Sequence, residues 1–269
     1  YDASGVAVEW ESIVAAARKE GLAHGVVPRG AGLLVSAADV QGYGIKWVVY
    51  ALGPRGQRWL VDREVFEGAP DQSDEPWIAL ADALGRRYQT SAGGEIGIDL
   101  SGVDSGFTTN RVYRFCSSRP NCFALDGRHA PGLPWLGTPS KRSIKGANGR
   151  QVAKALLYPV GNYDVKTEVV AGLANFVQGP SEAGHWPRNT LHLPPSLCDE
   201  AFAREMTSER LVDPEETISA NARRQPMIKA RAGREWKKLF GRQNDWFDAT
   251  VYALAIGWQS PPSRGRGSK

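Results

Sequence analysis

Three short apolar segments, separated by tight turns that contain glycine, occupy residues 33–66 and limit the folds open to this chain. The segments span residues 33–40, 45–52 and 59–66 and are rich in β-branched and aromatic side chains. The turns between them read QGYG and GPRG. Such short connections join antiparallel neighbours, so this stretch predicts a three-stranded antiparallel meander.

After the meander, segments with helical and strand periodicity alternate. We expect helices over 76–84, 108–118, 165–176, 198–209 and 244–256, and strands over 95–103, 121–125 and 156–160. A meander followed by β/α units is the order found in ribonuclease-H-like folds. The predicted fold class is therefore α/β, with a mixed sheet flanked by helices. A right-handed crossover would make the first strand and the strand after the first helix parallel neighbours, with their carboxyl ends side by side.

The composition excludes several classes of protein. Hydrophobic residues make up 42% and charged residues 23% of the chain, as in ordinary globular domains. No apolar run approaches the roughly 18 residues of a membrane span, and no signal-like segment opens the chain. The three cysteines favour a reducing compartment over a disulfide scaffold, and their spacing does not fit a zinc site.

Positive charge is concentrated near the carboxyl end. Residues 221–269 contain eleven Lys or Arg against three acids, a net charge of +8, so the total of +4 leaves −4 for residues 1–220. Such a basic block is expected of a protein with a phosphate-rich partner, and it is equally typical of a solvated helix face with a flexible tail.

Two acids fall at matching strand ends. Asp39 closes the first apolar strand just before a Gly turn, and Asp104 closes the fourth strand before Ser105-Gly106. Asp99 lies in the same fourth strand, at an odd offset that places it on the opposite face, so we favour Asp104. Any single Asp before a Gly is more often a turn former, and each of these acids has that alternative role.

A third acid, Asp248, lies in the helix predicted after Asn244, at the edge of the apolar stripe that would pack on the sheet. Asp245 lies one turn earlier and is expected closer to solvent. Three carboxylates that converge without a counter-cation usually bind a hard divalent cation. The sequence therefore predicts Asp39, Asp104 and Asp248 as ligands of Mg²⁺ or Mn²⁺, with two ions able to support phosphodiester cleavage.

These residues belong to an ordered series of segments that resembles the nuclease half of lambda-type phage terminase large subunits. The segments are VPRGAGLLVSAADVQ, WLVDREVFEG, VDSGFTTNRVYRF, VGNYDVKTEVVAGL, LHLPPSLCDEAFAREMTSERLV and NDWFDATVYALA, which lie between residues 8 and 256. Two departures are Asp245 in place of the usual Glu, and Asp126-Gly127 where the family often has Lys-Gly.

The resemblance implies a metal-dependent endonuclease, with Asp39, Asp104 and Asp248 as catalytic metal-binding acids, that cuts concatemeric double-stranded DNA during genome packaging. Its implied partners are DNA, the ATPase domain of the same subunit, a small terminase subunit and the portal of the procapsid. Its implied location is the host cytoplasm during phage assembly, with no secretion and no membrane contact. The sequence lacks a GxxxxGK[ST] motif, so we expect the ATPase half to be missing from it.

The expected domain organisation has three parts: residues 1–28 as the remnant of an interdomain connection, 29–258 as the nuclease domain, and 259–269 as a flexible basic tail. Asp99, Asp164 and Asp245 are expected as supporting or alternative acids. Lys166 is expected to face a phosphate. A surface ion pair between Asp164 and Lys166 explains these two residues nearly as well. The expected DNA-binding residues are Lys145, Lys166, Arg231, Arg234, Lys237, Lys238 and Arg242.

Two other functions remain open on the sequence. One is a catalytically silent module of the same fold that docks DNA or the portal. The other is a different ribonuclease-H-like nuclease, such as a junction resolvase.

Overall fold

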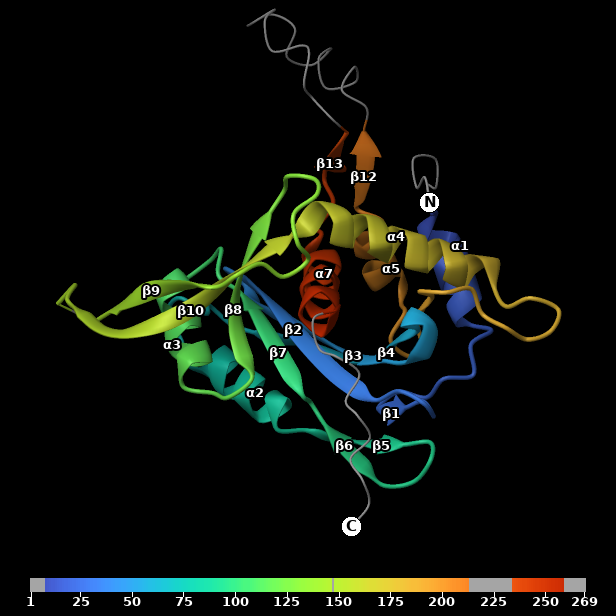
Figure 1. Ribbon diagram of the computed structural model, residues 1–269, viewed down its shortest axis with the longest axis horizontal. Coiled ribbons are helices and arrows are strands. Elements are labelled where there is room, and N and C mark those ends of the chain that lie inside the picture. The colour runs from blue at the N-terminus through green and yellow to red at the C-terminus, as the bar shows by residue number, and fades with distance from the viewer. Residues whose placement is uncertain (1–7, 147, 213–233, 259–269) are drawn as a thin grey trace, which may run out of the picture.

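A mixed sheet forms the centre of the molecule in the computed structural model, which describes residues 8–146, 148–212 and 234–258 (Figure 1). In the described residues this sheet has eight strands in the order β11-β4-β3-β2-β7-β8-β10-β9. Their bounds are β2 Leu33–Gln41, β3 Gly44–Leu52, β4 Arg58–Glu67, β7 Leu100–Asp104, β8 Cys122–Arg128, β9 Ser140–Lys145, β10 Gln151–Gly161 and β11 Leu191–His192.

The predicted meander and the predicted parallel pairing are both present. Strands β2, β3 and β4 are antiparallel neighbours. Strand β7 then lies parallel to β2, and β8 and β10 continue the parallel part of the sheet. β2 and β3 are almost wholly buried, because helices cover the sheet on both faces.

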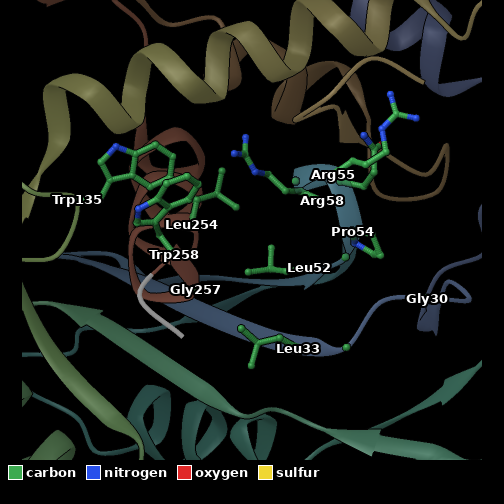
Figure 2. A pocket seen from close by; sticks show the side chains of 14 residues that line it. Gly30, Leu33, Leu52, Pro54, Arg55, Arg58, Trp135, Leu254, Gly257 and Trp258 are labelled. Atoms are coloured by element: carbon green, nitrogen blue, oxygen red, sulfur yellow. The ribbon is translucent and has the colours of Figure 1, made fainter. Parts of the chain in front are cut away.

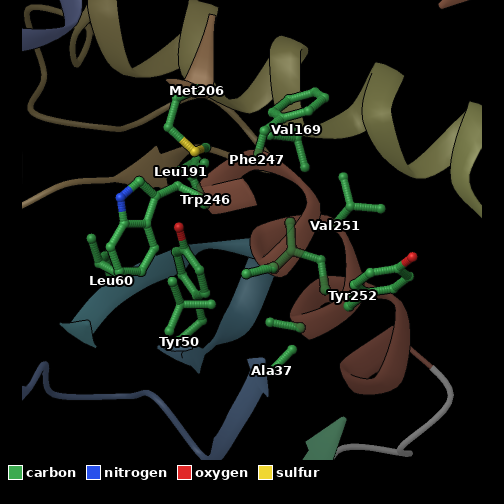
Figure 3. Close-up of a cluster of buried hydrophobic side chains, with 14 of the residues drawn as sticks. Ala37, Tyr50, Leu60, Val169, Leu191, Met206, Trp246, Phe247, Val251 and Tyr252 are labelled. Carbon is green, nitrogen blue, oxygen red and sulfur yellow. The ribbon is translucent and has the colours of Figure 1, made fainter. Parts of the chain in front are cut away.

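The two faces carry different helices. Helices α4 (Asn162–Gln178) and α7 (Asp245–Trp258) cover one face, with α1 (Trp10–Ala17) and α5 (Glu200–Met206) packed beside them. Helices α2 (Glu75–Leu84) and α3 (Thr109–Ser117) cover the other. Each face has its own apolar core, and on the α7 face Tyr50, Phe247 and Val251 pack between helix and sheet (Figure 3). We call these the α7 face and the α3 face.

The strand predicted over 95–103 is divided in the structure. β6 (Glu95–Gly97) joins β1 (Val26–Val27) and β5 (Arg87–Thr90) in a separate small sheet, and only β7 enters the large one. The division occurs at Asp99, whose carboxylate accepts a hydrogen bond from the backbone N–H of Leu34 at 2.9 Å. The single long strand was therefore a wrong prediction.

Two further differences lie near the carboxyl end. The helix predicted over 198–209 is shorter, because Asp199 caps α5 by accepting the N–H of Phe202 at 2.8 Å. The chain then forms an antiparallel ribbon of β12 (Glu209–Val212) and β13 (Glu235–Lys238), which the sequence did not predict.

The segment expected as an interdomain remnant packs on this body from residue 8 onward. Ile13 and Ala17 of α1 are buried in the core of the α7 face. The division into connection, nuclease domain and tail stays a prediction, and the tail itself lies outside the described residues. No helix in the described ranges is long and apolar enough to cross a membrane.

Candidate metal centre

Strand register places Asp39 beside Asp104. The parallel ladder between β2 and β7 ends with Ala38 opposite Val103, so the next residues on the two strands are Asp39 and Asp104. Ala38 and Val103 belong to the core of the α3 face. Because side chains alternate along a strand, both carboxylates lie on the α7 face.

Helix α7 brings Asp248 and Tyr252 over these strand ends. The helix packs on β2 and β7. The Tyr252 hydroxyl donates a hydrogen bond to the Asp104 carboxylate, whose Oδ2 also accepts the backbone N–H of Gly106 at 3.1 Å. Asp248 accepts a hydrogen bond from the side-chain amide of Asn244 at 2.7 Å. The structure thus gathers the three predicted acids at one edge of the sheet.

The three carboxylates act on one another electrostatically. Burial, followed by the negative charges of Asp248 and Asp104, holds the pKa of Asp39 well above its ordinary value, and Asp39 is only 3% exposed. Burial raises the pKa of Asp248 to about 6, against the opposing effect of Lys166, and Asp104 adds to the rise. Burial also raises the pKa of Asp104, although hydrogen bonds to its charged form oppose the rise.

Donor type and charge fit a hard divalent cation at this edge. The donors are carboxylate oxygens, the ligands that Mg²⁺ and Mn²⁺ prefer. Oδ1 of Asp248 is buried without a hydrogen-bond partner, although Nζ of Lys166 lies 3.2 Å away. No three His, Cys, Asp or Glu side chains in the described part of the chain form a closed metal-ligand group. The acids are therefore electrostatic neighbours that do not yet surround a common point.

Lys166 differs from the expectation of a phosphate-facing residue. Its Nζ is buried and lies 2.7 Å from both carboxylate oxygens of Glu209 and 3.2 Å from Oδ1 of Asp248. Burial lowers its pKa, but the charges of Asp248 and Glu209 outweigh burial and raise it. Lys166 lies in α4 and points into the protein because two acids neutralise its charge there. The expectation that Lys166 contacts DNA is therefore corrected.

Asp245 is more buried than the sequence indicated. It is 7% exposed, and its Oδ2 lies 3.3 Å from Nζ of Lys46 and accepts the Tyr43 hydroxyl. Lys46 also donates to Glu205 at 2.5 Å. Asp245 thus belongs to a buried charge network beside the three acids. Its negative charge still contributes to the raised pKa of Asp39.

The two remaining acids have structural partners. Asp99 precedes β7, at the opposite end of that strand from Asp104, and binds the backbone of Leu34. This position favours Asp104 over Asp99. Asp164 lies in the first turn of α4 and accepts the N–H of Gly132 at 3.0 Å, which fixes the loop before β9.

Sequence reasoning missed Lys46, Glu205, Glu209 and Tyr252. Lys46 could have been singled out from the sequence, because it is the one charged residue in the apolar strand GIKWVVYAL. No local sequence pattern points to Glu205, Glu209 or Tyr252, since their partners come from distant parts of the chain.

The predicted DNA-binding residues fall into two places. Arg234, Lys237 and Lys238 lie in or beside β13, Arg242 donates to the carbonyl oxygen of Thr207 at 3.2 Å, and Arg231 lies outside the described residues. Nζ of Lys237 lies 3.0 Å from Glu235, and Nζ of Lys238 donates to Asn244 at 3.4 Å. Lys145 ends β9, at the far edge of the sheet, and is exposed. Their contact with DNA stays a prediction.

A cavity of about 510 Å³ lies at the other end of β2, away from the acids (Figure 2). Leu33, Leu52 and Leu254 form its apolar wall, and the rings of Trp135 and Trp258 lie together with centroids 4.4 Å apart. Because Leu33 begins the strand that carries Asp39 near its end, this cavity and the acids occupy opposite edges of the sheet. The chemistry of the acids therefore does not involve it.

Comparison with known proteins agrees with this arrangement. The profile of a family described as the endonuclease domain of the terminase large subunit gpA matches residues 1–260. The large terminase subunit of Escherichia phage lambda is 25% identical over 237 residues, which cover 85% of this chain and 32% of that protein. The chain therefore spans about a third of the length of that relative.

Two solved structures are similar at low sequence identity. One is a mutant nuclease domain of the large terminase subunit gp2 of bacterial virus Sf6 with manganese, with a TM-score of 0.51, 10% identity, and coverage of 95% of this chain and 100% of that chain. The other is the nuclease domain of the large terminase g2p of bacteriophage SPP1 with bound Mn, with a TM-score of 0.38, 9% identity, and coverage of 87% and 97%. The likeness to the Sf6 domain confirms the predicted ribonuclease-H-like fold class.

Proposed function

This chain belongs to the family of terminase large-subunit gpA endonuclease domains, and from that membership we propose that it is a metal-dependent endonuclease that hydrolyses phosphodiester bonds of double-stranded DNA. The observation that carries the proposal is the placement of Asp39 and Asp104 side by side, with Asp248 above them. Burial is the main cause of the raised pKa values of these acids, and repulsion from neighbouring acids adds to it at Asp39 and Asp248. A bound cation would offset both costs.

Asp39, Asp104 and Asp248 are the residues that would hold Mg²⁺ or Mn²⁺, and we propose two ions. Such ions, when bound, lower the pKa of water and stabilise negative charge on phosphate and leaving oxygens. Manganese in the Sf6 and SPP1 structures is a property of those proteins and is in keeping with the proposal.

Neighbouring residues orient the three acids. Tyr252 donates to Asp104, and Asn244 donates to Asp248. Lys166 lies between Asp248 and Glu209, and its positive charge opposes the rise in the pKa of Asp248 that burial causes. These contacts preorganise the acids, which reduces the rearrangement needed when an ion and a phosphate arrive.

The wider role follows from the family and remains part of the proposal. We place the activity in the cutting of concatemeric viral DNA during packaging, in the host cytoplasm. The proposed partners are an ATPase domain of the same subunit, a small terminase subunit and the portal. A silent docking module and a junction resolvase are less consistent with membership of an endonuclease-domain family.

Nicking of supercoiled plasmid in Mn²⁺ or Mg²⁺, with and without chelator, tests the proposal. We expect the wild type to nick only with a divalent ion, and Asp39→Asn, Asp104→Asn and Asp248→Asn each to lose activity by at least about a hundredfold. Asp164→Asn is the matched control, because it removes one acidic charge outside this cluster, and it should remain active. Absence of nicking by the wild type in both metals would support the docking function instead, and cleavage restricted to branched DNA would support a resolvase.

A further inference from the structure

A second concentration of positive charge lies in residues 105–163. Residues 105–163 contain nine Lys or Arg against one acid, Asp126, a net charge of +8. With +8 in residues 221–269 and +4 in total, the rest of the chain carries −12. The 105–163 segment forms α3, β8, β9 and β10, which make up one end of the large sheet (Figure 1).

Strand alternation places three of these basic residues on the same face of the sheet as the metal-binding acids. Ile144 in β9 and Ala155 in β10 are buried on the α3 face. Lys154 alternates with Ala155 and pairs across the ladder with Ser143. Lys141 and Lys145 alternate with Ile144, so Lys141, Lys145 and Lys154 all lie on the α7 face. We call these three residues the lysine face.

No helix among the described residues covers the lysine face. Its three lysines are exposed, as are Val152 and Leu156 on the same side of β10, with exposed fractions of 63% and 46%. Helix α3 packs only on the opposite side of this hairpin. Among the described residues, no acid forms an ion pair with Lys141, Lys145 or Lys154.

The basic residues near β13 are less available. Lys166 is buried between two acids, and Lys237 is paired with Glu235. The acids at the metal centre repel a phosphate backbone until a cation is bound. Within the described ranges, the positive charge best placed to attract DNA is therefore charge near the centre that is not already neutralised.

The lysine face and the three acids are close enough for one DNA duplex to contact both. Along the strands, Tyr158 of β10 is level with Asp104, and Lys154 lies four residues earlier in β10, a displacement of about 13 Å. With two strand spacings of about 4.8 Å across the sheet, Lys154 is about 16 Å from Asp104. This is less than the roughly 34 Å of one turn of B-DNA. A backbone that lies on the lysine face can therefore continue over Asp104 and Asp39.

We propose that the lysine face binds the phosphate backbone of double-stranded DNA next to the metal centre and sets the direction in which the duplex crosses it. The inference deepens the proposed function and rests on it for the statement that the bound duplex is the one cleaved. Binding to the lysine face itself does not require cleavage.

The test combines Lys141→Glu, Lys145→Glu and Lys154→Glu in one variant of the full chain. Binding to a fluorescent duplex is measured by anisotropy in chelator at several salt concentrations. Loss of three phosphate contacts, each worth about 0.9, should flatten the slope of log affinity against log salt by about 2.7 and raise the Kd at low salt by at least about tenfold. Nicking should fall at low DNA concentration and recover at saturating DNA.

The matched control reverses Arg18, Lys19 and Arg29, which are exposed and lie outside the basic end of the sheet, so that net charge changes by the same amount. Equal melting temperatures of both variants and the wild type show that folding is intact. An unchanged Kd and salt slope in the lysine-face variant, or an equal loss in the control, would overturn the proposal. A wild type that binds DNA through the lysine face but never nicks would instead overturn the proposed function alone.

Discussion

At the scale of single residues, burial and negative neighbours favour the protonated forms of Asp39 and Asp248. The pKa of Asp39 is well above its ordinary value, and that of Asp248 is about 6. In the absence of metal, the folded state therefore binds protons more tightly than the unfolded state. The stability that these groups contribute is fully present below their unfolded pKa, near 4, and is lost as the pH rises through the folded values.

Asp248→Asn tests this relation without cleavage. A pKa of about 6 against an ordinary value of 3.8 corresponds to about 3 kcal/mol. In chelator, the variant should be more stable than the wild type by up to that amount at pH 8, with the difference shrinking towards pH 4. Denaturant unfolding at pH 4, 6 and 8 measures this difference. If the stability of the variant relative to the wild type falls between pH 4 and pH 8, burial and repulsion do not destabilise the charged form of Asp248.

At the scale of elements, the start of α7 is fixed by a buried charge network. Lys46 of β3 binds Glu205 of α5 and Asp245 of α7, and Glu205 also accepts the backbone N–H of Trp246 at 3.0 Å. The network joins three elements at the turn from which Asp248 projects. Its position therefore determines where α7 places that acid.

Lys46→Met should destabilise the protein by about 3 kcal/mol, because it leaves two buried acids without their cation. In a double-mutant cycle, Glu205→Gln should cost less in the Lys46→Met background than in the wild type, since the interaction is already lost. Arg87→Met, which breaks an exposed pair with Glu95, is the comparison and should cost at most about 1 kcal/mol. Additive costs at Lys46 and Glu205 would mean that they do not form one network.

The elements also show what sequence periodicity can predict. The meander and the parallel neighbour β7 were predicted correctly, because alternation and tight turns are local signals. The placement of Asp39 and Asp104 on these neighbouring strands follows from the same signals. The break at Asp99 and the β12–β13 ribbon were not. Asp99 bonds to Leu34, 65 positions away, and the ribbon pairs strands that are distant in sequence. Contacts between residues so far apart in the sequence cannot be predicted from local hydrophobic periodicity.

At the scale of the whole molecule, a repelling acidic centre lies next to a basic end of the sheet. The excess of +8 in residues 105–163 can be counted from the sequence, but only the strand register shows that Lys141, Lys145 and Lys154 share a face with Asp104. The buried positions of Lys166 and Asp245 likewise depend on packing between separate helices and strands. The sequence predicted how much charge each segment carries, but not the face of the sheet on which the charged side chains lie or how deeply they are buried.

Divalent ions should stabilise the whole molecule, because only folding brings the three acids to the same edge of the sheet. At a concentration 100 times the Kd, binding adds about 2.7 kcal/mol to the free energy of unfolding. We therefore expect millimolar Mn²⁺ to raise the Tm of the wild type and to leave that of Asp39→Asn almost unchanged. In chelator, Asp39→Asn should melt at the same temperature as the wild type or higher, and an equal Mn²⁺ shift in both proteins would place the ion elsewhere.

We propose that Asp39, Asp104 and Asp248 together bind the divalent ion. Titration of Mn²⁺ into the protein, followed by isothermal calorimetry, tests it most directly. We predict saturable binding by the wild type, a Kd raised at least about tenfold in each of Asp39→Asn, Asp104→Asn and Asp248→Asn, and wild-type affinity in Asp99→Asn. Loss of binding in Asp99→Asn together with wild-type binding in Asp104→Asn would contradict the account.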